Sequence, residues 1–104
     1  MCYKIKCQSQ EDQILAEYLG GSMTCDAYHM TSPHPDGKGI IECMKLALQD
    51  GGLTPSQIDY INPHATSTLV GDIAELKGMK ALFQEELKRI PISATKSMVG
   101  HGLG

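Results

Sequence analysis

Three side chains with the chemistry of proton-transfer or anion-binding groups stand out in the sequence: His64, Lys96 and His101. An imidazole can exchange a proton near neutral pH, and a lysine ammonium can compensate negative charge. Together, such groups can stabilise an anion that develops during a reaction. Taken singly, each also has an ordinary structural explanation, because loop histidines often only form hydrogen bonds and lysines usually carry surface charge.

Each of these residues follows a short apolar run typical of a buried strand. Residues 58–61 precede His64, and residues 91–94 precede Lys96 and His101. Between the two runs, apolar residues recur at near-helical spacing, at Ile73, Leu76, Met79 and Phe83. A right-handed crossover would make the two strands parallel, and the loops that follow them would then meet at one edge of the sheet. We therefore expect the three side chains to converge.

Two acidic residues open the helix between these runs. Asp72 and Glu75 fall in its first turn, where the helix dipole favours negative charge, and they lie three residues apart on one face. Their structural explanation is that they cap the helix start. Their functional explanation is that they lie near Lys96.

The N-terminal half predicts one more strand and one more helix. Residues 14–25 suit a strand with a bend at Gly20-Gly21, and residues 26–39 suit a loop. An apolar stripe from Ile40 to Leu48 predicts a helix that ends at Gly51-Gly52 and packs on a sheet. The capping-box spacing of residues 54–57 predicts one short helical turn. The predicted order is strand, helix, strand, helix, strand, an α/β arrangement.

The composition excludes two classes of partner. The 104 residues carry a formal net charge of −3, with acidic and basic residues interspersed, so no basic patch indicates nucleic-acid binding. No apolar run has membrane-spanning length, and the N-terminus lacks a charged-then-apolar leader. We expect neither nucleic acid nor a membrane as a partner.

The cysteines predict neither a disulfide framework nor a metal site. They are scattered, at Cys2, Cys7, Cys25 and Cys43, and we expect reduced thiols. Cys25 and Cys43 resemble small buried hydrophobes, and nothing in the sequence places a base beside either thiol. A zinc site built from Cys2, Cys7, His29 and His34 would depart from finger spacing, so no metal is expected.

Several motifs together resemble those of β-ketoacyl-[acyl-carrier-protein] synthases, the condensing enzymes of fatty-acid synthesis, in their elongating type I/II group. The motifs are Asn62-Pro63-His64-Ala65-Thr66-Ser67-Thr68, then Gly71-Asp72 with Glu75, and then Thr95-Lys96-Ser97-Met98-Val99-Gly100-His101. Residues 16–21 and 25–33 also look like that family. The resemblance covers residues 14–104, a partial synthase domain, and leaves residues 1–13 unmatched. It implies the thiolase-like fold, in which two similar α/β halves stack in five layers.

The resemblance also implies catalytic roles. His64 and His101 match the two active-site histidines that bind the malonyl thioester carbonyl and promote loss of carbon dioxide. Lys96 matches the active-site lysine, and Asp72 and Glu75 match the acids linked to that lysine.

Further implications concern the substrate. Thr66 and Thr68 match threonines that hydrogen-bond the phosphopantetheine arm of the carrier, so the chain needs no cofactor of its own. The implied partners are acyl carrier protein, malonyl and acyl thioesters, and a second copy in a full-length homodimer. The Ala65 variant and Leu19-Gly20-Gly21 favour the plastid stroma, with the bacterial cytoplasm as the alternative.

The sequence departs from the family pattern in three ways. Nothing matches the motif of the nucleophilic cysteine or the glycine- and phenylalanine-rich loop near the family's C-terminus, and Pro63 replaces the usual alanine before His64. We therefore predict that the isolated chain is inactive and exposes an apolar face of its sheet. The alternative is a noncatalytic thiolase-like fragment that binds acyl carrier protein or a partner subunit.

Overall fold

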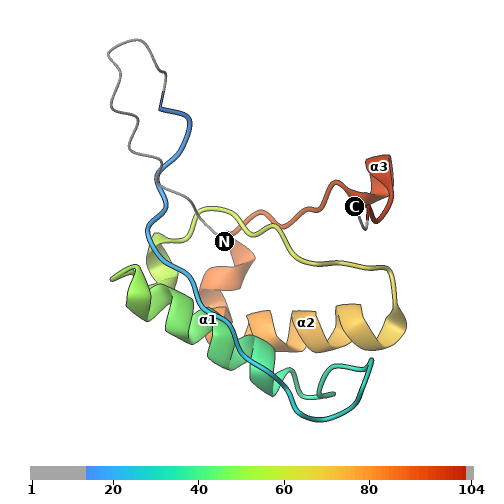
Figure 1. Ribbon diagram of the computed structural model, residues 1–104. Helices are drawn as coiled ribbons and strands as arrows, with labels where there is room; N and C mark the ends of the chain where they lie inside the picture. Colours follow the sequence, from blue (N-terminus) through green and yellow to red (C-terminus); the bar gives the residue numbers. More distant parts are fainter. Residues whose placement is uncertain (1–13, 103–104) are drawn as a thin grey trace.

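The computed structural model describes residues 14–102 and is mostly helical (Figure 1). In chain order its elements are α1 (Lys38–Asp50), η1 (Pro55–Gln57), α2 (Leu69–Phe83), η2 (Gln84–Lys88) and α3 (Lys96–Val99). Both long helices were predicted, and both are confirmed. The short turn is also confirmed, as a 3₁₀ helix with a capping box between Thr54 and Gln57.

Helix α1 packs against α2 rather than against a sheet (Figure 1). The contact is close because Gly78 of α2 has no side chain: a Cβ there would lie 3.0 Å from Ile40 Cγ2. The chain enters α1 through Gly37, whose φ of +64° is left-handed, and a Cβ at Gly37 would lie only 2.5 Å from the Ala74 carbonyl oxygen. Two glycines therefore set the distance between the helices.

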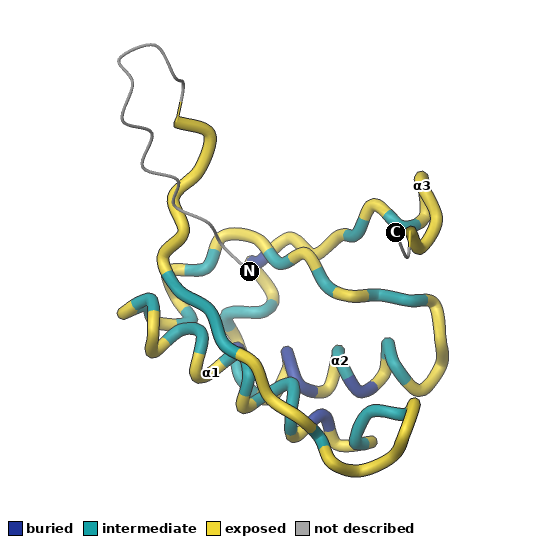
Figure 2. Tube along the Cα trace, in the orientation of Figure 1, coloured by how far each residue is buried: buried dark blue, intermediate teal, exposed yellow. Residues whose placement is uncertain are grey.

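The apolar core is small. Its buried side chains are Ala74, Met79, Phe83 and Ile90, which are 1–5% exposed. Met44, Ile58, Ile61, Leu82 and Leu87 pack around Met79, Phe83 and Ile90. Most of the described chain is half-buried or exposed, and the buried positions are Gly37, a group on one side of α2, and Ile90, two residues after η2 (Figure 2).

The prediction of a strand at residues 14–25 is wrong. This segment has no regular structure and runs along α1, to which it is bound through side chains (Figure 1). The Gly21 N–H donates to Asp50 Oδ2 over 3.0 Å, and the Thr24 hydroxyl donates to the Gly39 carbonyl over 2.9 Å. Because the Asp50 carboxylate takes the Gly21 N–H and no second strand lies beside the segment in the described part of the chain, no sheet ladder forms.

The other two predicted strands reduce to a single parallel bridge between Ile61 and Ile92. The Ile61 N–H donates to the Pro91 carbonyl over 3.0 Å, and the Ser93 N–H donates to the Ile61 carbonyl over 3.3 Å. The Tyr60 hydroxyl also bonds the Ser93 hydroxyl over 2.6 Å. The parallel direction was predicted correctly, but a strand order of strand, helix, strand, helix, strand is absent from residues 14–102.

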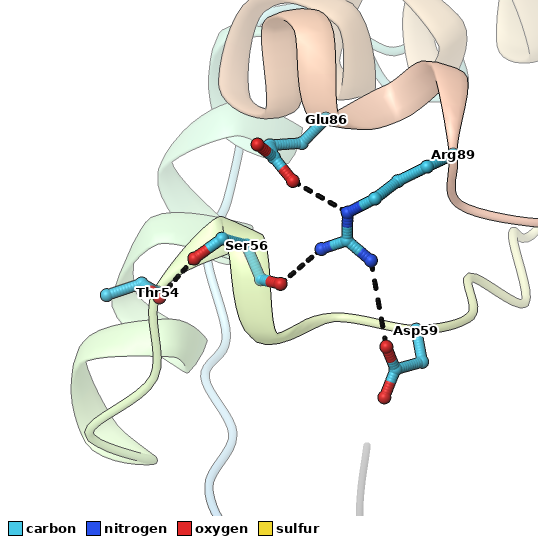
Figure 3. A network of polar contacts seen from close by, with 5 residues as sticks. All are labelled: Thr54, Ser56, Asp59, Glu86 and Arg89. Atoms are coloured by element: carbon cyan, nitrogen blue, oxygen red, sulfur yellow. Dashed lines mark hydrogen bonds and ion pairs between the residues drawn. The ribbon is translucent and has the colours of Figure 1, made fainter.

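A cluster around Arg89 holds the start of both extended segments in place (Figure 3). Its guanidinium donates to Glu86 over 2.7 Å and to the Ser56 carbonyl, and it pairs with Asp59 over 3.6 Å. These contacts connect η2, which leads to residues 91–94, with η1, which leads to residues 58–61. Residues 58–61 and residues 91–94 therefore both begin beside the Arg89 cluster, which fixes their starts relative to each other.

The described helices contain no segment that is both long and apolar enough to cross a membrane.

Candidate functional site

The structure brings His64 and His101 together. Their ring centroids lie 5.4 Å apart, with an angle of 71° between the ring planes, an edge-to-face arrangement. His64 lies in the loop after the Ile61–Ile92 bridge, and His101 follows α3. Both residues are exposed, so a ligand can reach the pair. At this separation, two imidazoles can donate N–H groups to one oxygen atom.

The loop that carries His64 has an uncommon backbone. Ala65 and Ser67 have positive φ angles, +44° and +64°, which residues with a Cβ rarely adopt. Pro63 precedes His64 and fixes its own φ near −65°, which limits the ways the chain can approach the histidine. The direction of the His64 side chain therefore depends on the unusual backbone conformation of this loop.

Glu75 holds this loop from the side of α2. Its Oε1 accepts from the His64 N–H over 2.7 Å, and its Oε2 accepts from the Ala65 N–H over 2.9 Å. Short hydrogen bonds to an ionised carboxylate are stronger than those between neutral groups. Sequence reasoning placed Glu75 beside a lysine and missed this contact.

Thr68 begins α2. Its hydroxyl accepts from the Gly71 N–H over 3.2 Å, which satisfies one of the free donors of the first turn. The Thr66 hydroxyl lies 3.1 Å from the Thr68 hydroxyl. The predicted phosphopantetheine-binding threonines therefore lie together at the helix start, and their binding role stays a prediction.

Lys96 forms the expected ion pair with neither Asp72 nor Glu75. Lys96 begins α3 and is half-buried, and within residues 14–102 no hydrogen bond or ion pair involves its ammonium group. Asp72 lies in the first turn of α2, and its Oδ1 is buried without a hydrogen-bond partner. The catalytic role of Lys96 and the supporting role of the acids stay predictions.

The cysteines among the described residues differ from each other. Cys43 is half-buried, and its sulfur lies 3.2 Å from the Ser22 hydroxyl. Cys25 is exposed, so the prediction that it is a buried hydrophobe is wrong. It lies in a shallow hollow at the start of α1 that charged side chains also line.

No group of three or more histidine, cysteine or acidic side chains within residues 14–102 is placed to hold a metal ion. Cys2 and Cys7, two members of the zinc set considered above, lie outside the described residues. The Nδ1 atoms of His29 and His34 accept nearby backbone N–H groups over 3.2 Å.

Comparison with characterised proteins finds close relatives. The chain is 53% identical over 91 residues to the chloroplastic 3-oxoacyl-[acyl-carrier-protein] synthase I of Hordeum vulgare, which covers 88% of this chain and 20% of the relative. It is 50% identical over 93 residues to 3-oxoacyl-[acyl-carrier-protein] synthase 2 of Vibrio harveyi, covering 88% and 22%. The chain thus spans about a fifth of the length of these relatives.

Solved structures give the same result. One match is to a chain in the structure of a type II PKS acyl-carrier protein in complex with its ketosynthase bound to the hexaketide. The TM-score is 0.79 and the identity 38%, over 83% of this chain and 21% of that chain. A β-ketoacyl synthase from Burkholderia phymatum matches with a TM-score of 0.67 and 38% identity, over 76% and 18%. The fold is therefore part of the thiolase-like ketosynthase fold.

The family match extends over almost the whole chain. Residues 15–104 match the family described as "Beta-ketoacyl synthase, C-terminal domain". These residues include the candidate catalytic residues and the residues expected to support them or bind substrate, namely His64, Lys96, His101, Asp72, Glu75, Thr66 and Thr68. The chain belongs to the β-ketoacyl synthase family, within its C-terminal domain.

Proposed function

We propose that this chain is part of a 3-oxoacyl-[acyl-carrier-protein] synthase of fatty-acid biosynthesis, an acyltransferase that condenses malonyl-carrier with an acyl thioester. The observation that carries the proposal is the edge-to-face pair of His64 and His101 within a chain of this family. Both rings are exposed, as a pair of donors to a substrate oxygen must be.

The proposed chemistry begins with the malonyl thioester. Cleavage of the bond to the carboxylate releases carbon dioxide and leaves its electron pair on the remaining carbon, as an enolate of the thioester. Its negative charge develops on the carbonyl oxygen, where two imidazole N–H groups stabilise it. The enolate carbon then attacks the carbonyl of an acyl thioester, forms a carbon–carbon bond, and expels the thiolate that held the acyl group.

The residues proposed for the first step all lie in this chain. His64 and His101 supply the donors, and Lys96 supplies positive charge at the start of α3. The thiolate that holds the acyl group in the second step is a cysteine in the family, at a helix N-terminus that lowers its thiol pKa. No motif of this sequence matches that cysteine, so the isolated chain is proposed to be inactive in condensation.

Acyl carrier protein is the proposed partner. A similar solved structure holds a ketosynthase together with its acyl-carrier protein. Thr66 and Thr68 lie beside each other, two and four residues after His64, where hydroxyl groups can bond the phosphopantetheine arm. Homodimerisation is proposed for the full-length synthase, and the proposed location is the plastid stroma, with the bacterial cytoplasm as the alternative.

A graft tests this function. Residues 15–104 replace the matching segment of the barley synthase, with which this chain is 53% identical. We expect the graft to extend an acyl chain from malonyl-carrier. A folded, dimeric graft without condensation or carbon dioxide release would contradict the proposal.

A second candidate is a noncatalytic chain that binds acyl carrier protein or a partner subunit, as a similar solved structure holds a ketosynthase together with its acyl-carrier protein. The two candidates differ in one result. An enzyme component restores condensation when the rest of a synthase is supplied, whereas a binding module captures acyl carrier protein but leaves the reconstituted protein inactive.

A further inference from the structure

The loop between Ile61 and α2 holds its histidine in a backbone conformation that the loop does not favour by itself. Ala65 has a φ of +44°, and the left-handed region is disfavoured for a residue with a Cβ by about tenfold or more. Ser67 repeats this two residues later, with a φ of +64°. An unrestrained loop would therefore populate other conformations, and His64 would then point elsewhere.

One side chain opposes this relaxation. The Glu75 carboxylate receives the His64 N–H at Oε1 and the Ala65 N–H at Oε2, over 2.7 and 2.9 Å, so its two oxygens hold two consecutive peptide groups. The second of these peptide groups belongs to the left-handed residue itself. The carboxylate therefore holds the loop at the point of strain.

The base of Glu75 is rigid. It lies on α2 directly after Ala74, which is 1% exposed, and four residues before the buried Met79. The helix starts at the Thr68 cap, at the far end of the same loop. The loop is therefore fixed at its C-terminal end by the cap and at its N-terminal end by the carboxylate.

We propose that Glu75 is a positioning residue, whose carboxylate holds residues 64 and 65 in the strained conformation and thereby aims the His64 imidazole at His101. The importance of Glu75 for catalysis rests on the proposed function, whereas its placement of the His64 imidazole does not. This role differs from that of a counter-ion for Lys96, because both oxygens are occupied by backbone N–H groups and Lys96 has no ion pair within residues 14–102.

The experiment compares isotope-labelled full chains by NMR. Glu75→Gln keeps the shape of the side chain but replaces one acceptor with a donor that faces an N–H. We expect amide hydrogen exchange at His64 and Ala65 to accelerate by about tenfold, the equivalent of one lost charge-assisted hydrogen bond. The nuclear Overhauser contact between the rings of His64 and His101 should be lost. Glu85→Gln, an exposed partner of Lys88, is the matched control and should change neither signal.

A second substitution separates positioning from general structural support. Ala65→Gly removes the cost of a positive φ, so in the Glu75→Gln chain it should recover about fivefold of the lost protection at His64 together with the ring contact. If Glu75→Gln unfolds the chain, Ala65→Gly alone still tests the proposal, because relief of the strain at residue 65 should slow hydrogen exchange at the His64 amide.

Three results would overturn the proposal. Exchange at His64 and Ala65 within twofold of wild type in folded Glu75→Gln would show that the carboxylate does not hold the loop. Equal acceleration by Lys96→Met would assign Glu75 to the lysine instead. If Ala65→Gly slows amide exchange at His64 in neither the wild-type nor the Glu75→Gln chain, the positive φ of Ala65 does not strain the loop. None of these measurements uses a substrate, so an inactive graft with this exchange pattern would contradict only the proposed function.

Discussion

At the scale of single residues, the histidine pair is formed by two separate segments of the backbone, the loop that carries His64 and the segment after α3 that carries His101. His64 is aimed by a loop with positive φ angles that Glu75 restrains, and His101 follows α3 at the other side of the Ile61–Ile92 bridge. The rings meet edge to face, at 5.4 Å between centroids, from residues 37 positions apart. The pair is therefore a product of tertiary structure rather than of either motif alone.

Replacing His64 with Ala in the graft should lower the rate of carbon dioxide release from malonyl-carrier by about 10²- to 10³-fold, the typical effect of removing one oxyanion donor. The measurement is the initial rate under saturating malonyl-carrier. His29→Ala is the matched control, because His29 is also an exposed loop histidine whose Nδ1 accepts only local N–H groups. An equal loss in both variants would contradict a specific role for His64.

The sequence predicted the convergence of the two histidines, because both follow runs that were expected to be parallel and adjacent. It could not predict the partner of Glu75, since an acid in the first turns of a helix can bond a lysine, a helix N-terminus or a loop with the same spacing. Likewise, Ala65 and Ser67 carry no residue-type signal for a positive φ, which glycine or asparagine would have given.

At the scale of elements, the start of α2 depends on a capping side chain. Thr68→Ala removes the acceptor for the Gly71 N–H and should lower the free energy of unfolding by about 1 kcal/mol. Thr66→Ala is the control, because Thr66 bonds the Thr68 hydroxyl but caps no helix. Urea denaturation of the two variants measures the difference, and equal losses would contradict the capping role.

The approach of α1 to α2 should depend on Gly37. Gly37→Ala should destabilise the fold by about 3 kcal/mol, because it combines a left-handed φ with a Cβ 2.5 Å from the Ala74 carbonyl oxygen. Gly52→Ala is the matched control: its φ is also +64°, but nothing lies within 4 Å of its Cβ position, so about 1 kcal/mol is expected. If thermal unfolding shows a similar loss of stability for Gly37→Ala and Gly52→Ala, the close contact of α1 with α2 at Gly37 contributes little to stability.

Helices were predicted better than strands for a physical reason. A helix satisfies its backbone within one segment, so apolar spacing and terminal glycines identified α1, and apolar spacing behind Asp72 identified α2. A strand needs a neighbour, and in residues 14–25 the Gly21 N–H and the Thr24 hydroxyl bond α1 groups instead. Residues 58–61 and 91–94 find each other but no further strand within the described part of the chain, so their pairing stops at one bridge.

At the scale of the whole molecule, the described structure exposes much apolar surface. Leu69, Val70, Ile73 and Leu76 of α2 are 43–84% exposed, although the opposite side of the helix holds the core. The predicted exposed apolar face therefore exists, but it lies on helices and loops rather than on a sheet. Such surfaces commonly mark contacts with other protein segments.

The isolated chain should therefore bind the dye ANS more strongly than the graft does. In the graft, the remainder of the synthase is expected to cover much of this surface, and the fluorescence per chain should fall by at least about threefold, in keeping with burial of a large apolar patch. Equal fluorescence from the isolated chain and the graft would contradict this expectation.

The role of the histidine pair is tested most directly by a double-mutant cycle on carbon dioxide release by the graft, with His64→Ala, His101→Ala and both together. If the two imidazoles act as one unit on one enolate oxygen, the double variant should lose little more than the worse single variant, because residues that act together are strongly non-additive. Losses that multiply would show that the histidines act independently. Unchanged rates in all three variants would contradict the claim that this pair carries the chemistry.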